Sequence, residues 1–160
     1  MSTVFVQTVE LRLLAFVASW GIACPALQAA PLQCAPAGID EYAVVRYVID
    51  GDTVVLADRR KVRLIGINAP EIGREGRRSQ VLAEPARGAL KRLLTGQSRV
   101  GLRYDRQRRD KFGRQLSHLL LGDGTNVQAW LLERGLATAL IFPPNLDYVD
   151  CYRDAERAAR

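Results

Sequence analysis

The stretch that decides the fold comprises Val48–Leu56 (VIDGDTVVL), a short polar turn, and Arg63–Glu71 (RLIGINAPE). Around Arg63 both alternating sets of positions are largely apolar, so we expect a strand that is buried on both faces. Because desolvating a guanidinium is costly, a buried arginine needs an anionic partner. That partner is a carboxylate, with Asp52 and Glu71 as the candidates, or a bound phosphate.

The charge of the chain is concentrated in one block. The 160 residues are 48% hydrophobic and 25% charged, as in a globular domain with a core, and the net charge is +6. Residues 59–114 alone carry 17 Lys and Arg against 5 Asp and Glu. Such a block indicates a polyanionic partner, and a solvated face that keeps the protein soluble is the alternative.

The single histidine, His118, excludes several classes of hydrolase. The chain does not have the residues for a nuclease or esterase site built on paired histidines, on a histidine–metal cluster or on a Ser-His-Asp triad. His118 lies in the apolar run 116–121, so we expect it in the core. The three cysteines form no Cys-x-x-Cys pair, which argues against structural zinc.

Residues 11–27 form a short apolar stretch that Pro25 interrupts, and Gln28-Ala29-Ala30 follow it. This pattern is typical of a secretory signal peptide rather than a membrane span. We therefore expect residues 1–30 to be a signal peptide, with an uncleaved anchor as the alternative, and residues 31–160 to form the folded domain. The mature protein would be secreted or periplasmic, without stable membrane association.

Cleavage of that leader would leave Cys34 and Cys151 in an oxidising compartment. Two cysteines are the right number for one disulfide, which would tie the mature N-terminus to a C-terminal helix. Two unrelated thiols are the alternative.

Hydrophobic patterns predict five strands, at about 42–48, 53–56, 61–67, 99–104 and 115–121. A helix is expected after the third strand, from near Pro85 to Gly96, and two more at about 127–134 and 147–159; residues 138–142 read as extended. Five strands with a helix after the third match the order of an OB-fold barrel. We expect an α+β, mainly β domain: a five-stranded OB-fold barrel with about three helices.

Three blocks of residues carry a resemblance to a known family. They are Ile49–Val54 (IDGDTV), the run from Arg63 to Glu71, and Asp110–Arg114 (DKFGR), and Gly135–Ala137 (GLA) follows them. In order and spacing the chain resembles the staphylococcal nuclease-like, or thermonuclease, family from about Tyr42 to the C-terminus.

The resemblance implies a calcium-dependent phosphodiesterase on an OB-fold that cleaves DNA and RNA with little sequence preference. By position, Arg63 and Arg114 would hold the scissile phosphate, and Glu71 would be the general base that orients or deprotonates water. The chemistry agrees, because two guanidiniums and a cation stabilise the charge that develops on the phosphoryl oxygens. Arginine suits this role through its planar fork, and a carboxylate base needs no histidine.

The resemblance also implies a Ca²⁺ site formed by Asp52, Asn68 and the backbone carbonyl of Ala69. Calcium is a hard cation that takes such oxygen ligands together with water. The family usually has an aspartate at the position of Asn68. We therefore expect weaker calcium binding or a changed metal preference.

Three further positions concern the nucleotide. Lys111 and the ring of Phe112 fall where the family contacts nucleotide phosphates and rims the pocket. The family's base-stacking tyrosines fall near Phe142, which could stack on a base but carries no hydroxyl group.

We expect the protein to be a monomer. Two other readings of its function stay open at this point. A catalytically silent OB-fold module would bind nucleic acid through the same basic surface without cleaving it. A structural envelope protein with a basic outer face would leave the set of Arg63, Glu71 and Arg114 without an explanation.

Overall fold

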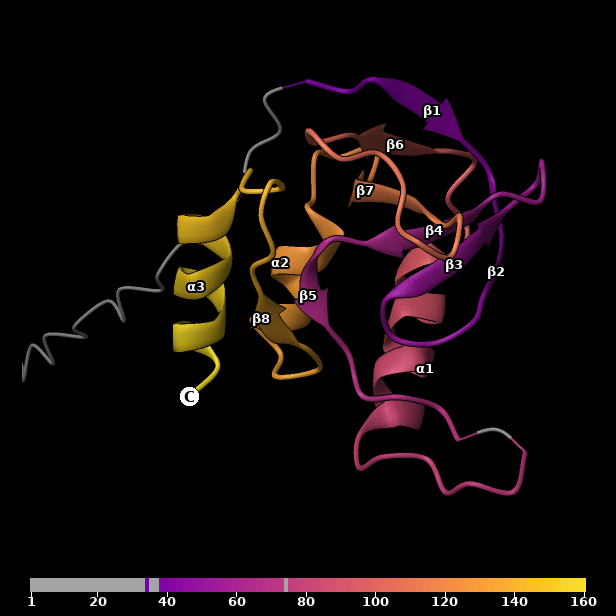
Figure 1. Cartoon of the computed structure of the whole chain (residues 1–160), viewed down its shortest axis with the longest axis vertical. Helices are drawn as coiled ribbons and strands as arrows, with labels where there is room; N and C mark the ends of the chain where they lie inside the picture. Colours follow the sequence, from indigo (N-terminus) through magenta and orange to yellow (C-terminus); the bar gives the residue numbers. More distant parts are fainter. Residues whose placement is uncertain (1–33, 35–37, 74) are drawn as a thin grey trace, which may run out of the picture. The chain divides into compact units, whose positions relative to one another are not determined.

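The computed structural model describes Cys34, residues 38–73 and residues 75–160, so the leader expected at residues 1–30 lies outside the described part. Eight strands and three helices occur in the described residues (Figure 1). In chain order they are β1 (Glu41–Ala43), β2 (Val45–Val48), β3 (Thr53–Leu56), β4 (Lys61–Leu64), β5 (Gly66–Asn68), α1 (Ala83–Leu94), β6 (Val100–Arg103), β7 (Gln115–Leu120), α2 (Val127–Leu132), β8 (Thr138–Leu140) and α3 (Val149–Ala158). The mainly β fold class with three helices is confirmed.

Six strands form one mixed sheet in the order β1-β6-β7-β4-β3-β2, in which only β4 and β7 run parallel. Its two outer strands follow one another in the chain, separated only by Val44. Ala43 pairs with Val100 in β6, whereas Val45 pairs with Leu56 in β3. Among the described strands no ladder joins β1 to β2, so the sheet is open where we expected a closed barrel.

The third expected strand, residues 61–67, is divided into β4 and β5. Gly66 has φ +83° and turns the chain, after which β5 leaves the main sheet and pairs with β8. A Cβ at Gly66 would lie 2.4 Å from a ring carbon of Tyr152 in α3, so the turn needs glycine both for its backbone conformation and for this close approach.

The helices pack on the strands through apolar faces. In α1 the buried residues are Ala83, Ala86, Ala89, Leu90 and Leu94, and this helix contacts β2. The helices α2 and α3 contact each other, and they contact β7 and β8 respectively (Figure 1). None of the helices in the described residues has the length and apolar character that crossing a membrane would require.

The predicted disulfide and the predicted core histidine are both confirmed. Cys34 is bonded to Cys151, which ties the chain ahead of β1 to α3. His118 is buried in β7, and its Nδ1 lies 2.7 Å from the hydroxyl of Tyr152 in α3.

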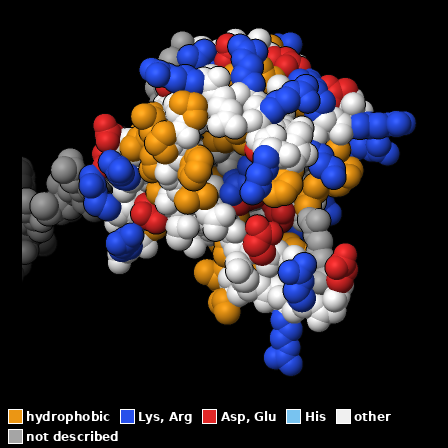
Figure 2. Space-filling view, in the orientation of Figure 1, with side chains coloured by type: hydrophobic (Ala, Val, Ile, Leu, Met, Phe, Trp, Pro, Cys, Tyr) orange, Lys and Arg blue, Asp and Glu red, His pale blue; other side chains and the backbone are white. Residues whose placement is uncertain are grey.

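Basic side chains are prominent on the face of the molecule that Figure 2 shows. Figure 2 shows Lys and Arg over the tip of the β3–β4 hairpin and over the loop between β6 and β7. Both segments lie within the basic block of residues 59–114.

Candidate active site

The Asp-Gly-Asp turn between β2 and β3 is fixed by its own hydrogen bonds and by close packing. Asp50 Oδ1 accepts a hydrogen bond from the N–H of Asp52 at 3.1 Å, the local bond that favours aspartate in turns. A Cβ at Gly51 would lie 2.6 Å from the Cβ of Ala69 and 2.8 Å from that of Ala86. Only glycine therefore lets the turn approach both the end of β5 and α1.

Asp52 connects this turn to the Asn-Ala-Pro-Glu corner. Its Oδ2 accepts a hydrogen bond from the N–H of Ala69 at 2.8 Å and lies 3.0 Å from Nη2 of Arg63. Its Oδ1 accepts from the hydroxyl of Thr53 at 3.0 Å. Burial raises the pKa of Asp52 to about 6, although Arg63 and the N–H of Ala69 lower it, and the charge of Asp50 adds to the rise.

Arg63 in β4 has the carboxylate partner that its burial requires, and that partner is Asp52. Its guanidinium also donates to the carbonyls of Leu64 and Ile67 and, at 3.3 Å, to Oδ1 of Asn68. Burial lowers the pKa of Arg63, and the charge of Asp52 opposes this shift. The charges of Arg114, Asp50 and Glu71 also act on this pKa, so these groups share one neighbourhood.

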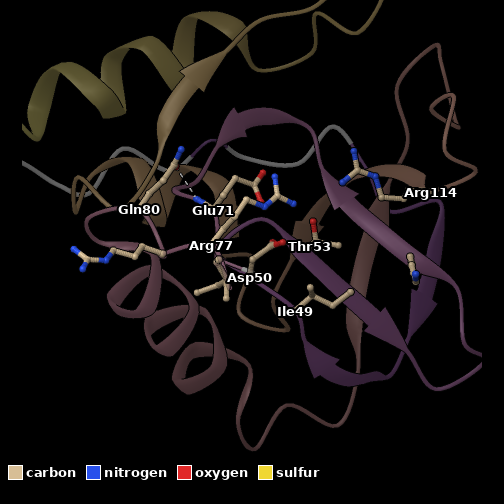
Figure 3. A pocket seen from close by; sticks show the side chains of 11 residues that line it. Ile49, Asp50, Thr53, Glu71, Arg77, Gln80 and Arg114 are labelled. Atoms are coloured by element: carbon tan, nitrogen blue, oxygen red, sulfur yellow. Dashed lines mark hydrogen bonds between the residues drawn. The ribbon is translucent and has the colours of Figure 1, made fainter. Parts of the chain in front are cut away.

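Glu71 lines a pocket of about 550 Å³ together with Arg114 and the first carboxylate of the turn, Asp50. In Figure 3, Asp50, Thr53 and Glu71 point into this pocket, and Arg114 reaches toward them from the other side. We call it the active pocket; the full lining is Ile49, Asp50, Thr53, Lys61, Glu71, Ile72, Gly73, Arg77, Arg78, Gln80 and Arg114.

The backbone of Glu71 is held by the far end of its own loop. Its N–H donates to Oε1 of Gln80 at 2.8 Å, and its carbonyl accepts from the N–H of Gln80 at 3.0 Å (Figure 3). Between these bonds the N–H of Gly73 donates to Oγ of Ser79 at 3.0 Å. A Cβ at Gly73 would lie 2.0 Å from the carbonyl oxygen of Arg77, so the loop is closed tightly on itself.

Arg114 is positioned by the turn that precedes β7. Asp110 Oδ1 accepts from the N–H groups of Phe112 and Arg114, both at 2.9 Å. Its Oδ2 lies 2.7 Å from Nε of Arg114, which leaves the terminal nitrogens of the guanidinium without a carboxylate partner in the described residues. Gly113, at φ +76°, provides the left-handed residue of this turn.

A second pocket, of about 400 Å³, adjoins the first. Arg114 lines both pockets, and Arg63 lines the second. The three residues that the sequence assigns to the nucleotide, Lys111, Phe112 and Phe142, all line this second pocket. The rings of Phe112 and Phe142 are 73% and 74% exposed.

The structure thus brings Arg63, Glu71 and Arg114 to two adjoining pockets, and it places Asp52 in the buried turn, paired with Arg63. The two other expected metal ligands, Asn68 and Ala69, show different contacts. Asn68 is exposed and its side-chain oxygen faces Arg63, while Ala69 contacts Asp52 through its N–H.

Sequence reasoning gave no role to Asp50, Lys61, Arg77 or Gln80. Asp50 was visible as the first residue of the Asp-Gly-Asp turn, and Arg77 as part of an arginine-rich loop. Gln80 carried no signal, because its role depends on how the loop closes.

The oxygen donors of the site suit a hard cation that keeps much of its water. In the described ranges no three His, Cys, Asp or Glu side chains form a group that could hold a metal ion. Two buried carboxylates, Asp50 and Asp52, do lie beside one another, and the charge of the first raises the pKa of the second. A cation next to them would favour their ionised forms, and an all-oxygen set fits calcium or magnesium rather than zinc.

Comparison with known proteins places this site in a family. The family model for staphylococcal nuclease homologues matches residues 61–160. The chain is 39% identical over 121 residues to the thermonuclease of Staphylococcus intermedius, covering 73% of this chain and 70% of that protein. It is 34% identical over 122 residues to the thermonuclease of Staphylococcus hyicus, covering 74% and 70%. It is 36% identical over 117 residues to endonuclease YncB of Bacillus subtilis (strain 168), covering 70% and 54%. The chain therefore belongs to the family of staphylococcal nuclease homologues.

Proposed function

We propose that the protein is a calcium-dependent nuclease that hydrolyses phosphodiester bonds of DNA, RNA or both. The observation that carries the proposal is the meeting of Glu71, Arg114 and Asp50 in one pocket, with the Arg63–Asp52 ion pair beside it. Relatives named thermonuclease and endonuclease support it.

In this mechanism Glu71 is the base. Its carboxylate orients a water molecule and accepts a proton from it while the water oxygen attacks phosphorus and the bond to the leaving oxygen breaks. The leaving oxygen takes up a proton from solvent and departs as an alcohol. Two hydrogen bonds with Gln80, one donated and one accepted by the backbone of Glu71, fix that backbone before substrate binds and so reduce the ordering that binding requires.

Arg63 and Arg114 hold the phosphoryl oxygens. Asp52 and two backbone carbonyls keep the guanidinium of Arg63 in place before any phosphate arrives. Donors fixed in advance stabilise the negative charge of the transition state without reorganising during the reaction.

Asp52 and Asp50 would hold the cation, with Asn68 and the carbonyl of Ala69 as the further oxygen donors that the resemblance implies. When bound, a hard cation supplies positive charge that neutralises the phosphoryl oxygens. The chain's own part is to keep two carboxylates together in a buried turn.

Nucleotides bind in the second pocket, where the exposed rings of Phe112 and Phe142 offer stacking surfaces and Lys111 meets a phosphate. Residues 31–160 act as a monomer after removal of residues 1–30 as a signal peptide. A secreted or periplasmic location is supported by the disulfide between Cys34 and Cys151, which persists in oxidising compartments.

Incubation with plasmid and with single-stranded DNA and RNA, in calcium and in excess chelator, tests the proposal. We expect cleavage in calcium and none in chelator. Salt-sensitive retention of nucleic acid without cleavage under either condition would instead identify a binding module.

A further inference from the structure

We propose that a third pocket, next to the active pocket, binds backbone phosphates of a single-stranded polynucleotide beyond the scissile one. The inference rests on the proposed nuclease function and specifies how a polymeric substrate is held. The pocket measures about 270 Å³ and is lined by Arg59, Arg60, Lys61, Arg109, Phe112, Gly113, Arg114 and Gln115. We call it the arginine groove.

The arginine groove is continuous with the pockets already described. It shares Lys61 and Arg114 with the active pocket, and Phe112 and Arg114 with the second pocket. A strand whose scissile phosphate lies at Arg114 can therefore continue directly into the groove.

Three cations of the groove are available for an anion. Arg59, Lys61 and Arg109 are exposed, and none of them forms an ion pair with a carboxylate of the described chain. Arg60 differs, because it is paired with Glu41 and Asp58. Arg60 therefore has a structural role, whereas the other three cations have no carboxylate partner in the described residues. Figure 2 shows this basic surface at the tip of the β3–β4 hairpin.

The backbone presents these cations from fixed positions. Arg59 has φ 72°, a left-handed conformation that glycine or asparagine adopts at lower cost. Its N–H donates to the carbonyl of Leu56 at 2.9 Å, so the turn holds it there. Arg109 forms a bridge with Gln115 at the start of β7. The tight turn of the hairpin accounts for this conformation, and it keeps the backbone of Arg59 in one place at the rim of the groove.

A single-stranded polynucleotide fits this arrangement best. Its repeating phosphates match a row of cations, and its unpaired bases can stack on the exposed ring of Phe112 between the groove and the second pocket. An acidic peptide would use the cations but would gain nothing from the aromatic ring or from continuity with the active pocket.

The test measures binding in a Glu71→Gln background, so that cleavage does not consume the probe. The groove variant is Arg59→Gln with Arg109→Gln. The matched control is Arg46→Gln with Lys91→Gln, which removes two exposed cations from a pocket that shares no lining residue with the groove. Each protein is titrated with a labelled single-stranded 12-mer, a 5′-phosphorylated dinucleotide and a polyglutamate peptide over a range of salt concentrations.

For the 12-mer we expect the groove variant to bind at least about tenfold more weakly in 50 mM salt. We also expect the slope of log affinity against log salt to fall by about 1.4, because each phosphate contact on a single strand contributes about 0.7. Dinucleotide binding should change less than twofold, and the control pair should leave the slope for the 12-mer unchanged.

An unchanged slope for the 12-mer would overturn the proposal. So would an equal loss in the control pair, an equal loss for the dinucleotide, or an equal loss for polyglutamate, since each of these would make the effect one of general charge or of the active pocket. Failure of the nuclease function would show separately, as a wild-type protein that does not cleave the 12-mer in calcium.

Discussion

The guanidinium of Arg63 is held by four oxygen acceptors: the carboxylate of Asp52, the carbonyls of Leu64 and Ile67, and the amide oxygen of Asn68. Its side chain is 13% exposed, so the group has lost most of its hydration and needs these partners. The same contacts that stabilise it in the fold also set its direction toward the pockets.

Replacing Asn68 by aspartate should strengthen calcium binding. The change adds a carboxylate near Asp52, and calcium affinity rises with the number of charged ligands. We expect Kd for calcium to fall by about tenfold, or about 1.4 kcal/mol. Isothermal titration calorimetry of Asn68→Asp, with Asn68→Ala as the control that loses the oxygen, measures this effect. An Asn68→Asp protein with the wild-type Kd would show that this position does not contact the cation.

Gln80 should act as a positioning residue for Glu71. Gln80→Leu removes the acceptor of the Glu71 N–H, and we expect kcat to fall roughly 10- to 100-fold with KM within twofold, because misplacing a catalytic group by about 1 Å has effects of this size. Gln80→Glu keeps an acceptor oxygen and should restore most of kcat. Steady-state kinetics of the two variants tests this, and equal losses in both, or a change confined to KM, would contradict it.

At the scale of elements, sequence patterns predict best those strands and helices whose buried residues can be recognised from the spacing of apolar residues within the element itself. The strand at 53–56 occurs as expected, and the first helix occurs within two residues of its expected bounds. The division of the third strand at Gly66 could not be predicted, because it depends on the pairing of β5 with β8 and on the close approach of Tyr152, which lies 86 positions further along the chain. In the site, the cost of burying a charge predicted an anionic partner for Arg63, and the structure identifies Asp52 among the candidates. The closure of the Glu71 loop by Gln80 is a tertiary contact without a sequence signature.

His118, which is buried where β7 meets α3, should make the stability of the protein sensitive to acid. Burial lowers the pKa of His118 to about 4 from an ordinary value of 6.5. The folded state therefore binds fewer protons than the unfolded state between these values, so the stability is fully present above pH 6.5 and is lost as the pH falls toward 4. The full loss is about 3 kcal/mol.

Urea unfolding at pH 7.5 and pH 4.5 measures this loss, with His118→Phe as the variant that cannot titrate. Relative to the variant, the wild type should lose roughly 2–3 kcal/mol of stability between the two pH values. Equal losses in both proteins would assign the acid sensitivity to other groups.

At the scale of the whole molecule, the disulfide links positions 117 residues apart and so closes nearly all of the described chain into a loop. Such a crosslink restricts the unfolded state most when the loop is long. Replacing both Cys34 and Cys151 by alanine should lower the free energy of unfolding by about 2–5 kcal/mol. Urea unfolding under oxidising and reducing conditions checks this, since only the wild type should respond to the reductant. A wild type that is equally stable in both conditions would contradict the prediction.

The central claim is that Glu71, flanked by Arg63 and Arg114, hydrolyses phosphodiesters, and the cleavage rate of Glu71→Gln tests it most directly. With a labelled single-stranded oligonucleotide in saturating calcium, we predict a rate at least about 100-fold below that of the wild type, the contribution typical of a general base. Binding of the oligonucleotide should stay within about twofold, because the two arginines remain. A variant that cleaves within tenfold of the wild-type rate would contradict the account.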